Sequence, residues 1–166
     1  MTVLPGKQGA SQRYPGHIYR GDLGADLDAL RVAGIGSLLL LVEDDELALW
    51  GDVAIVARGA AAGIEVVRHP MPDGSPPASA AAMDVILASL AEARDVCDAA
   101  VACMGGVGRT GTVVACALVR AGWRPESAIG RVRALRHPTA VETSSQEEFV
   151  RSYWREGGGR SATVSP

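Results

Sequence analysis

The segment 99–111 near the middle of the chain constrains the fold more than any other part of the sequence. It begins with a short apolar run of strand length, holds Gly105, Gly106 and Gly108 at its centre, and leads into a helical pattern. A glycine-rich turn between a strand and a helix lets successive backbone N–H groups point inward, and the helix N-terminus adds partial positive charge. We therefore expect a buried strand, an anion-binding loop and a helix in direct succession.

Apolar runs of strand length alternate with longer helical patterns along the rest of the chain. This alternation predicts an α/β domain around a largely parallel sheet. The strands are expected at 17–20, 36–42, 64–69 and 99–103. The helices are expected at 26–34, 52–63, 78–96, 110–121, 125–135 and 144–155. Glycine or proline marks several of the helix ends.

Length and composition favour a single compact domain. The chain has 166 residues, of which 48% are hydrophobic, so it lies within the usual single-domain range and can bury one core. We expect an N-terminal arm at 1–16, the domain itself at 17–156 and a flexible C-terminal tail at 157–166.

Charge and hydropathy exclude two kinds of partner. The 19 acidic and 16 basic residues are scattered along the chain and give a net charge of -3, so no basic stripe is present for nucleic acid. The longest aliphatic run, 38–42, is far too short to cross a bilayer, so no membrane partner is expected. Three cysteines, an odd number, favour a reducing compartment, which predicts a cytoplasmic protein.

The side chains around the three glycines predict nucleophilic chemistry on a phosphate group. Cys103 lies at the mouth of the positive field, which favours the thiolate, the nucleophilic form of cysteine. Arg109 can present a planar fork to two phosphate oxygens, and Thr110 can donate its hydroxyl to the sulfur when the sulfur leaves. The residues between them are expected to bind the phosphate of the substrate: Met104, Gly105, Gly106, Val107 and Gly108.

A structural alternative is that Cys103 is a buried core thiol and that the glycines only make a tight turn. A lone cysteine would favour that alternative, but here a nucleophile, glycines, an arginine and a hydroxyl occur in one strand-to-helix crossing. The three histidines share no metal-ligand spacing with the cysteines. We therefore predict an active site that uses neither a metal nor a cofactor.

The sequence resembles the cysteine-dependent protein phosphatases, whose signature is cysteine, five residues, arginine and then serine or threonine, as in 103–110 (CMGGVGRT). It is most similar to the compact dual-specificity class, particularly its kinase-associated phosphatase branch. The resemblance extends from about Tyr19 to Phe149 and includes 68–74 (RHPMPDG) and 140–146 (AVETSSQ). It implies a central sheet flanked by helices and metal-independent hydrolysis of a phosphomonoester through a phosphocysteine.

The resemblance also implies roles for residues outside the loop. Asp73 matches the acid loop of the family, where a carboxyl group gives a proton to the leaving alcohol and later takes one from water. Without the resemblance, the local Pro-Asp-Gly sequence would favour a simple surface turn. Gln146 stands where related enzymes orient the hydrolytic water, and Glu142 stands where many relatives carry glutamine. Thr143 and Gln146 equally fit a capping box at a helix start.

Other residues are expected to play lesser parts. The acidic cluster 43–46 is a rival source of protons, but its composition favours a solvated loop. Ala102 stands where the family has a histidine before the nucleophile, which predicts slower chemistry. Cys97 and Cys116 can in principle pair with an oxidised Cys103, although the helical position of Cys116 favours core packing.

The expected substrate is a phosphorylated protein or peptide carrying phosphotyrosine, phosphoserine or phosphothreonine. Two alternatives stay open: a slow or inactive phosphate-binding module, which Ala102 motivates, and a nucleotide or RNA-end phosphatase. A lipid phosphatase is disfavoured because the loop offers Met104 and Val107 where a polyanionic head group would need lysines. A sulfur-transferring domain would leave Asp73 and Arg109 without a role.

Overall fold

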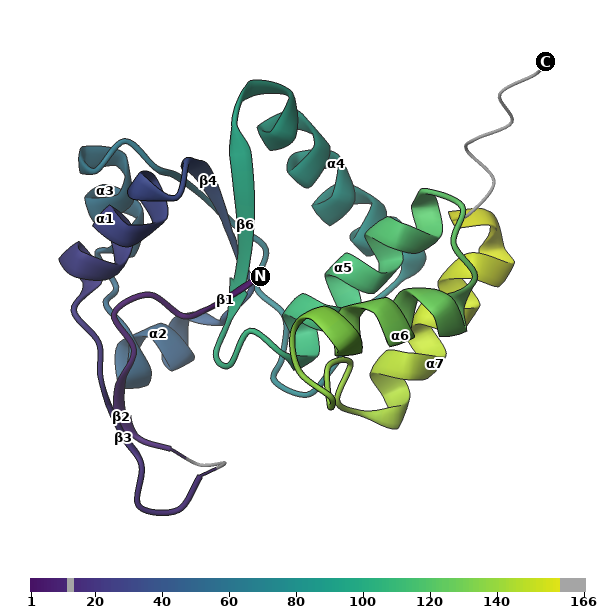
Figure 1. Cartoon of the computed structure of the whole chain (residues 1–166), viewed down its shortest axis with the longest axis horizontal. Helices are drawn as coiled ribbons and strands as arrows, with labels where there is room; N and C mark the ends of the chain where they lie inside the picture. The colour runs from purple at the N-terminus through teal and green to yellow at the C-terminus, as the bar shows by residue number, and fades with distance from the viewer. Residues whose placement is uncertain (12–13, 159–166) are drawn as a thin grey trace.

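The computed structural model describes residues 1–11 and 14–158 and folds them around a four-stranded sheet (Figure 1). The strand order is β1 (Thr2–Val3), β6 (Asp98–Cys103), β4 (Ile35–Leu40) and β5 (Glu65–Arg68), and each neighbouring pair is parallel. The predicted α/β class with a parallel sheet is confirmed. Because the strands are parallel, their carboxyl ends meet at one edge, where a site can be assembled from several loops.

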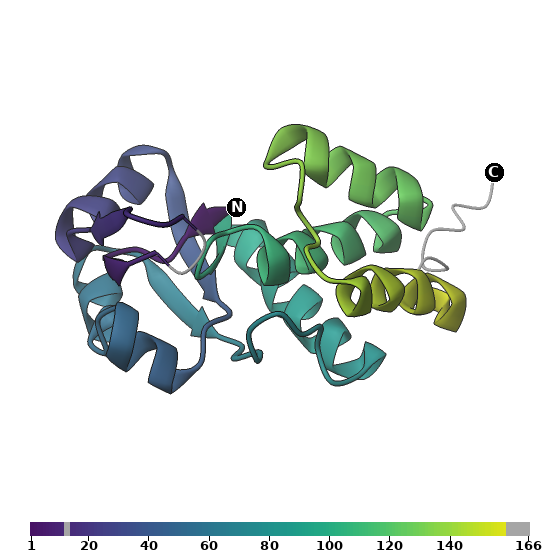
Figure 2. The same cartoon turned by 90° about the horizontal axis from the view of Figure 1, so that it is seen from below.

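Helices cover both faces of this sheet, as Figure 1 and the view from below in Figure 2 show. One face carries α1 (Leu23–Val32), α2 (Asp44–Trp50) and α3 (Ile55–Ala61). The other face carries α4 (Ala80–Val96), α5 (Gly108–Arg120), α6 (Pro125–Leu135) and α7 (Ser144–Tyr153), which continues into η1 (Trp154–Gly158). The predicted arrangement of a central sheet flanked by helices is confirmed.

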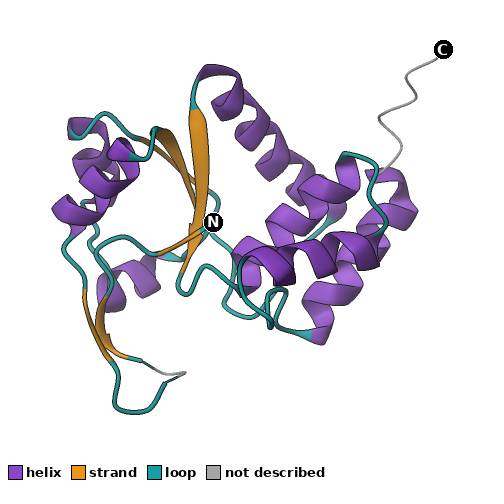
Figure 3. Ribbon diagram, viewed as in Figure 1, coloured by secondary structure: helices purple, strands orange, loops and turns teal. Residues whose placement is uncertain are grey.

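A small hairpin stands apart from the main sheet (Figure 3). It pairs β2 (Gln8–Ala10) with β3 (Ile18–Arg20) in antiparallel fashion, with Gly9 opposite Tyr19. The strand predicted at 17–20 therefore forms, but its partner is β2 and not a strand of the main sheet. A Cβ on Gly9 would lie 2.9 Å from the ring of Trp50, so the absence of a side chain lets β2 lie against α2.

Alternation along the central strands separates two hydrophobic cores. Leu39 of β4, Val101 and Cys103 of β6 pack with the layer of α4 to α7. Leu40 and Ala102 point the other way and pack with the layer of α1 to α3. Since successive side chains of a strand face opposite sides of the sheet, Cys103 and Ala102 belong to different cores.

Several parts of the fold differ from the prediction. The acidic cluster 43–46 is not a solvated loop, because Glu43 and Glu46 form a capping box at the start of α2. The helix expected from residue 52 begins only at Ile55, since the side chain of Asp52 accepts the backbone N–H of Ala54 in the preceding turn. Such local side-chain bonds compete with helix formation.

The sequence predicts that both ends of the chain lie outside the folded domain. The expected arm 1–16 supplies β1 and β2, and Leu4 between them is fully buried. Of the expected tail 157–166, residues 159–166 lie outside the described part of the chain. In the part of the chain that the structure describes, no helix is long and apolar enough to cross a membrane.

We predict that Ala102→His destabilises the protein, because Ala102 is fully buried in the core formed with α1 to α3. Adding a large side chain to a packed core costs about 1–3 kcal/mol of unfolding free energy. Urea unfolding of the variant measures this loss, and Ala134→His, at an exposed position of α6, is the matched control. Equal stability of the two variants would contradict the prediction.

Candidate active site

The loop 103–108, which we call the glycine-rich loop, connects β6 directly to α5. Gly106 has φ +64°, a conformation that residues with a side chain rarely adopt, and a Cβ there would collide with the carbonyl oxygen of Thr2. A Cβ on Gly108 would collide with the carboxylate of Glu142. Glycine is therefore required at Gly106, whereas a side chain at Gly108 would force the carboxylate of Glu142 to move.

A cavity of about 460 Å³ lies beside the glycine-rich loop. Its lining includes the predicted catalytic residues Asp73, Cys103 and Arg109, and three of the residues that were predicted to bind the phosphate: Met104, Gly105 and Val107. Further polar and aromatic side chains line it as well: Lys7, Tyr14, Tyr19, Glu46, Trp50 and Glu142. The fold thus brings the predicted nucleophile, cation and acid together in one hollow.

Arg109 is fixed by an unusually complete set of partners, although only 1% of its surface is exposed. Its Nη1 donates to Oε2 of Glu46 at 2.6 Å, and its Nη2 donates to Oε1 at 2.7 Å. Nη1 also donates to the carbonyl of Met71 at 2.9 Å. Because a bidentate contact sets both position and rotation of the planar group, α2 and the segment after β5 orient the guanidinium.

The ion pair shifts the pKa of both groups toward the charged state. Burial alone would lower the Arg109 pKa, but the hydrogen bonds to Glu46 and the charges of Cys103, Glu46 and Asp73 raise it above its ordinary value. Burial likewise acts to raise the pKa of Glu46, but the hydrogen bonds from Arg109 and from the backbone of Glu43 lower it below its ordinary value. Both groups are therefore charged at neutral pH.

Asp73 lies next to the part of the Arg109 guanidinium that the hydrogen bonds to Glu46 and Met71 leave unoccupied. Its Oδ1 lies 2.9 Å from Nη2 of Arg109, and its side chain is 73% exposed. Glu46 and Met71 take the N–H groups of Nη1 and one of Nη2, so the remaining edge consists of Nε and the other N–H of Nη2. The fork predicted for phosphate is bound to Glu46 in this structure, and the Nε–Nη2 edge is the one left for an oxyanion.

Thr110 lies in the first turn of α5 with its hydroxyl buried. Among the described residues its Oγ1 has no hydrogen-bond partner, so the predicted donation to the sulfur of Cys103 is not formed here. A buried hydroxyl without a partner is uncommon, because desolvation is then uncompensated. The hydroxyl is thus positioned inside the protein with its hydrogen-bonding capacity unused.

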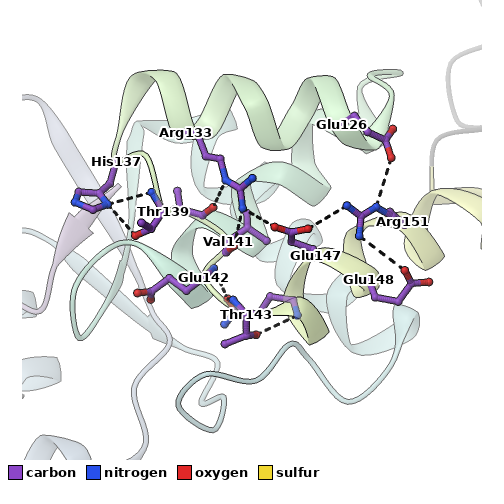
Figure 4. Close-up of polar contacts among 12 residues, drawn as sticks. Glu126, Arg133, His137, Thr139, Val141, Glu142, Thr143, Glu147, Glu148 and Arg151 are labelled. Carbon is purple, nitrogen blue, oxygen red and sulfur yellow. Dashed lines mark hydrogen bonds and ion pairs between the residues drawn. The ribbon is translucent and has the colours of Figure 1, made fainter. Parts of the chain in front are cut away.

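The connection between α6 and α7 contains a strained residue next to the cavity. Val141 has φ +59°, which is rare for a β-branched side chain. Its N–H donates to the carbonyl of Val107 at 3.3 Å, while Arg133 donates to the carbonyls of Ala140 and Val141 (Figure 4). These contacts hold the backbone so that Glu142 lies against the glycine-rich loop and lines the cavity.

The start of α7 holds the acid loop, which comprises residues 72–75. Oγ1 of Thr143 donates to the carbonyl of Gly74 at 2.9 Å, and Nε2 of Gln146 donates to the carbonyl of Ser75 at 3.4 Å. Gln146 is fully buried, and its Oε1 accepts the N–H of Glu142 at 2.9 Å. Gln146 therefore braces the acid loop, and its contact with substrate stays a prediction.

Two cavity residues, Glu46 and Lys7, were not predicted as parts of the site. Glu46 follows the carboxyl end of β4 closely, and its capping-box spacing from Glu43 is a signal that could have placed it on a helix at this edge. Lys7 carries no comparable signal in the sequence. Its place depends on the pairing of β2 with β3, which sets its Nζ 3.8 Å above the ring of Tyr19.

A family model described as "PTP-SAK: Swiss Army Knife protein, DSP-PTPase phosphatase domain" matches residues 15–151. The chain belongs to this phosphatase family. It is 26% identical over 141 residues to cyclin-dependent kinase inhibitor 3 of Sus scrofa and 25% identical over 136 residues to that of Homo sapiens. Each match covers 81% of this phosphatase chain but only 64% of the relative, which is less than two thirds of its length.

Solved phosphatase structures share the fold. A crystal structure of kinase-associated phosphatase, with serine in place of its catalytic-site cysteine, gives a TM-score of 0.81 at 24% identity and covers 93% of this chain and 84% of that one. The active form of Tk-PTP gives a TM-score of 0.69 at 31% identity, and the match covers 80% of this chain and 86% of that one. The predicted dual-specificity family and the likeness to the kinase-associated branch are confirmed.

Cys97, Cys103 and Cys116 are all free thiols, and only Cys103 lines the cavity. Burial, with a smaller contribution from the charge of Asp84, raises the pKa of Cys116 far above its ordinary value, so this thiol is inert at neutral pH. Within residues 1–11 and 14–158, no group of three or more His, Cys, Asp or Glu side chains is arranged to hold a metal ion.

We predict that Glu46→Gln lowers kcat/KM by about 10–100-fold, by analogy with the range known for outer-shell partners that orient metal ligands. The amide keeps the shape of Glu46 but cannot hold both terminal nitrogens of Arg109 as a charged acceptor. The variant should also be less stable at neutral pH, because the lowered pKa of Glu46 contributes stability that is lost only as pH falls through it.

Kinetics and urea unfolding at neutral and acidic pH check this prediction. The stability difference between the wild type and Glu46→Gln should shrink in acid. Asp45→Asn removes a neighbouring, exposed carboxylate of α2 and is the matched control. Wild-type kcat/KM in Glu46→Gln would show that Arg109 is oriented without its partner.

Proposed function

We propose that this phosphatase domain hydrolyses phosphomonoesters without a metal ion, through a phosphocysteine formed on Cys103. The observation that supports this most directly is the cavity lined jointly by Cys103, Arg109 and Asp73. A nucleophile, a fixed cation and a proton donor are the groups that phosphoryl transfer requires from the protein when no metal takes part. Membership in the phosphatase family supports the same reaction.

In the first step, the thiolate of Cys103 attacks phosphorus, and the bond from phosphorus to the leaving oxygen breaks. The Nε–Nη2 edge of Arg109 and the N–H groups of the glycine-rich loop bind the phosphoryl oxygens. A phosphate at this edge takes the place of Asp73, whose Oδ1 lies 2.9 Å from Nη2 without substrate. The displaced carboxylate takes up a proton from solvent and, as a carboxylic acid, donates it to the leaving oxygen, so that the alcohol departs.

In the second step, water attacks the phosphocysteine. The carboxylate of Asp73 takes a proton from this water, the phosphorus–sulfur bond breaks, and inorganic phosphate leaves the regenerated thiolate. The unused hydroxyl of Thr110 is well suited to donate to the sulfur as negative charge develops there. In this proposal Gln146 acts by holding the acid loop and the backbone of Glu142 in place beside the cavity.

We further propose a phosphorylated protein or peptide as the substrate and the cytoplasm as the location, where reducing conditions keep Cys103 as a thiol. The names of cyclin-dependent kinase inhibitor 3 and kinase-associated phosphatase support a protein substrate linked to kinases. The aromatic side chains of Tyr14, Tyr19 and Trp50 beside the cavity suit flat or apolar groups next to the phosphate. A panel of phosphopeptides, nucleotides and RNA ends distinguishes this substrate from the nucleotide alternative.

We predict that Cys103→Ser abolishes turnover of p-nitrophenyl phosphate but still binds tungstate, because the loop and Arg109 remain while the hydroxyl is a weak nucleophile. Rate measurements with chelator present and a tungstate titration check both parts. Cys97→Ser, outside the cavity, is the control. Wild-type turnover in Cys103→Ser would exclude the phosphocysteine, whereas a wild-type chain that binds tungstate without turnover would be a phosphate-binding module.

We predict that Asp73→Asn slows the first step in proportion to how poor the leaving group is. A seryl or tyrosyl oxygen needs a proton to leave, so its release should slow by roughly 100-fold, as expected for loss of a general acid. The p-nitrophenolate ion leaves without a proton and should be affected less. Because breakdown of the phosphocysteine can limit turnover, the burst of the first step has to be measured.

The tungstate affinity of the same Asp73→Asn variant shows whether the geometry of the glycine-rich loop is preserved. Removal of the carboxylate that faces Arg109 should leave this affinity unchanged or increase it. If the burst slows equally for both leaving groups, or for neither, Asp73 is not the acid, and Glu142 is the next carboxyl group of the cavity to test.

A further inference from the structure

Two cationic side chains, far apart in the sequence, donate to backbone carbonyls of the glycine-rich loop. Nζ of Lys7 donates to the carbonyl of Met104 at 3.1 Å. At the end of α6, Nε of Arg136 donates to the carbonyl of Gly106 at 3.0 Å, and its Nη2 donates to the carbonyl of Gly105 at 3.4 Å. Three successive carbonyls of the loop therefore accept hydrogen bonds from cations.

The direction of these carbonyls determines the direction of the N–H groups beside them. In a planar trans peptide unit the C=O and the N–H point opposite ways. The carbonyls of Met104, Gly105 and Gly106 share their peptide units with the N–H groups of Gly105, Gly106 and Val107. Each carbonyl that is held by a cation therefore fixes the next N–H in the opposite direction, and an anion nest depends on N–H groups whose directions are fixed.

Packing against β1 also holds the glycine-rich loop in place. β1 pairs with β6 so that Val3 lies opposite Cys103. A Cβ on Gly106 would meet the carbonyl of Thr2 and would lie 2.8 Å from Nη2 of Arg136. The loop is therefore held between β1 and Arg136, and its positive-φ glycine has no room to turn over.

We propose that Lys7 and Arg136 are positioning residues that keep the N–H groups of the glycine-rich loop directed at the oxyanion before it binds. The inference rests on the proposed function, in which this loop binds the phosphate of the substrate. Donors that are already oriented need no reorganisation during binding or reaction, so they contribute more to affinity and rate than mobile ones.

The two residues allow positioning to be separated from direct charge. Lys7 lines the cavity, so its ammonium group also attracts an anion directly. Arg136 is not among the described residues that line the cavity, so it does not contact a bound oxyanion there, and an effect of Arg136 that persists at high ionic strength acts through the loop. Arg136 therefore provides the sharper test, and Lys7 provides an independent one.

We expect Arg136→Met to weaken tungstate binding by about tenfold and to raise KM for p-nitrophenyl phosphate, as known for partners that orient binding groups. Arg136→Lys keeps a cation and one donor, so it should recover part of the affinity. Arg131→Met removes an exposed arginine of the same helix that contacts no loop carbonyl and should bind tungstate like the wild type. Titration calorimetry and thermal unfolding of each variant give the comparison.

Lys7→Met keeps the aliphatic stem over Tyr19 but removes the donor to Met104, and Lys7→Arg restores a charged donor. We expect Lys7→Met to weaken tungstate binding and Lys7→Arg to rescue it. The loss should persist at high ionic strength, because salt screens direct attraction but leaves the orientation of the loop unaffected. A loss that disappears at high salt would overturn the positioning role of Lys7.

Wild-type tungstate affinity in folded Arg136→Met, or an equal loss in Arg131→Met, would overturn the inference for Arg136. If Arg136→Met does not fold, Arg136→Lys and the two Lys7 variants decide in its place. A wild-type chain that neither binds tungstate nor hydrolyses p-nitrophenyl phosphate would overturn the proposed function itself. That result is distinguishable from a failure of the inference alone, in which the wild type is active and the variants equal it.

Discussion

The buried ion pair between Arg109 and Glu46 is the interaction on which the candidate site depends. A guanidinium that is only 1% exposed would be strongly unfavourable without a charged partner, and Glu46 supplies one with two hydrogen bonds. The pair also determines which edge of Arg109 remains for an oxyanion, because it occupies one N–H of each terminal nitrogen. The helix α2 is therefore part of the active-site architecture, although its sequence begins as an acidic cluster typical of a surface loop.

The N-terminal residues belong to the site as closely as the glycine-rich loop does. β1 extends the sheet beside Cys103, and Lys7 reaches the carbonyl of Met104 from the same segment. The family model begins at residue 15, so these contacts lie before the matched region. The first ten residues of this chain supply an edge strand, one strand of the hairpin and part of the cavity wall.

Much of the core and of the chemistry could be predicted from local patterns. The strands at 36–42, 64–69 and 99–103 and the helix from Pro125 were expected close to where they form, because apolar runs and proline placement are local signals. The prediction from the sequence is wrong where contacts between distant segments determine the conformation and the surroundings of a residue. The composition of the acidic cluster 43–46 predicts a solvated loop, since nothing nearby in the sequence indicates that Glu46 faces a buried arginine.

The sequence by itself determined the α/β class, the glycine-rich turn and the presence of a cysteine, an arginine and a hydroxyl in one crossing, because these depend on neighbouring residues and on backbone stereochemistry. Only the tertiary structure decided which groups surround them. The approach of Asp73 to Arg109, the clamp of Thr143 on the acid loop and the reach of Lys7 to the loop carbonyl each join segments tens of residues apart. Such contacts follow from the parallel register of the strands, which gathers the ends of separate segments at one edge of the sheet, and no local pattern contains that register.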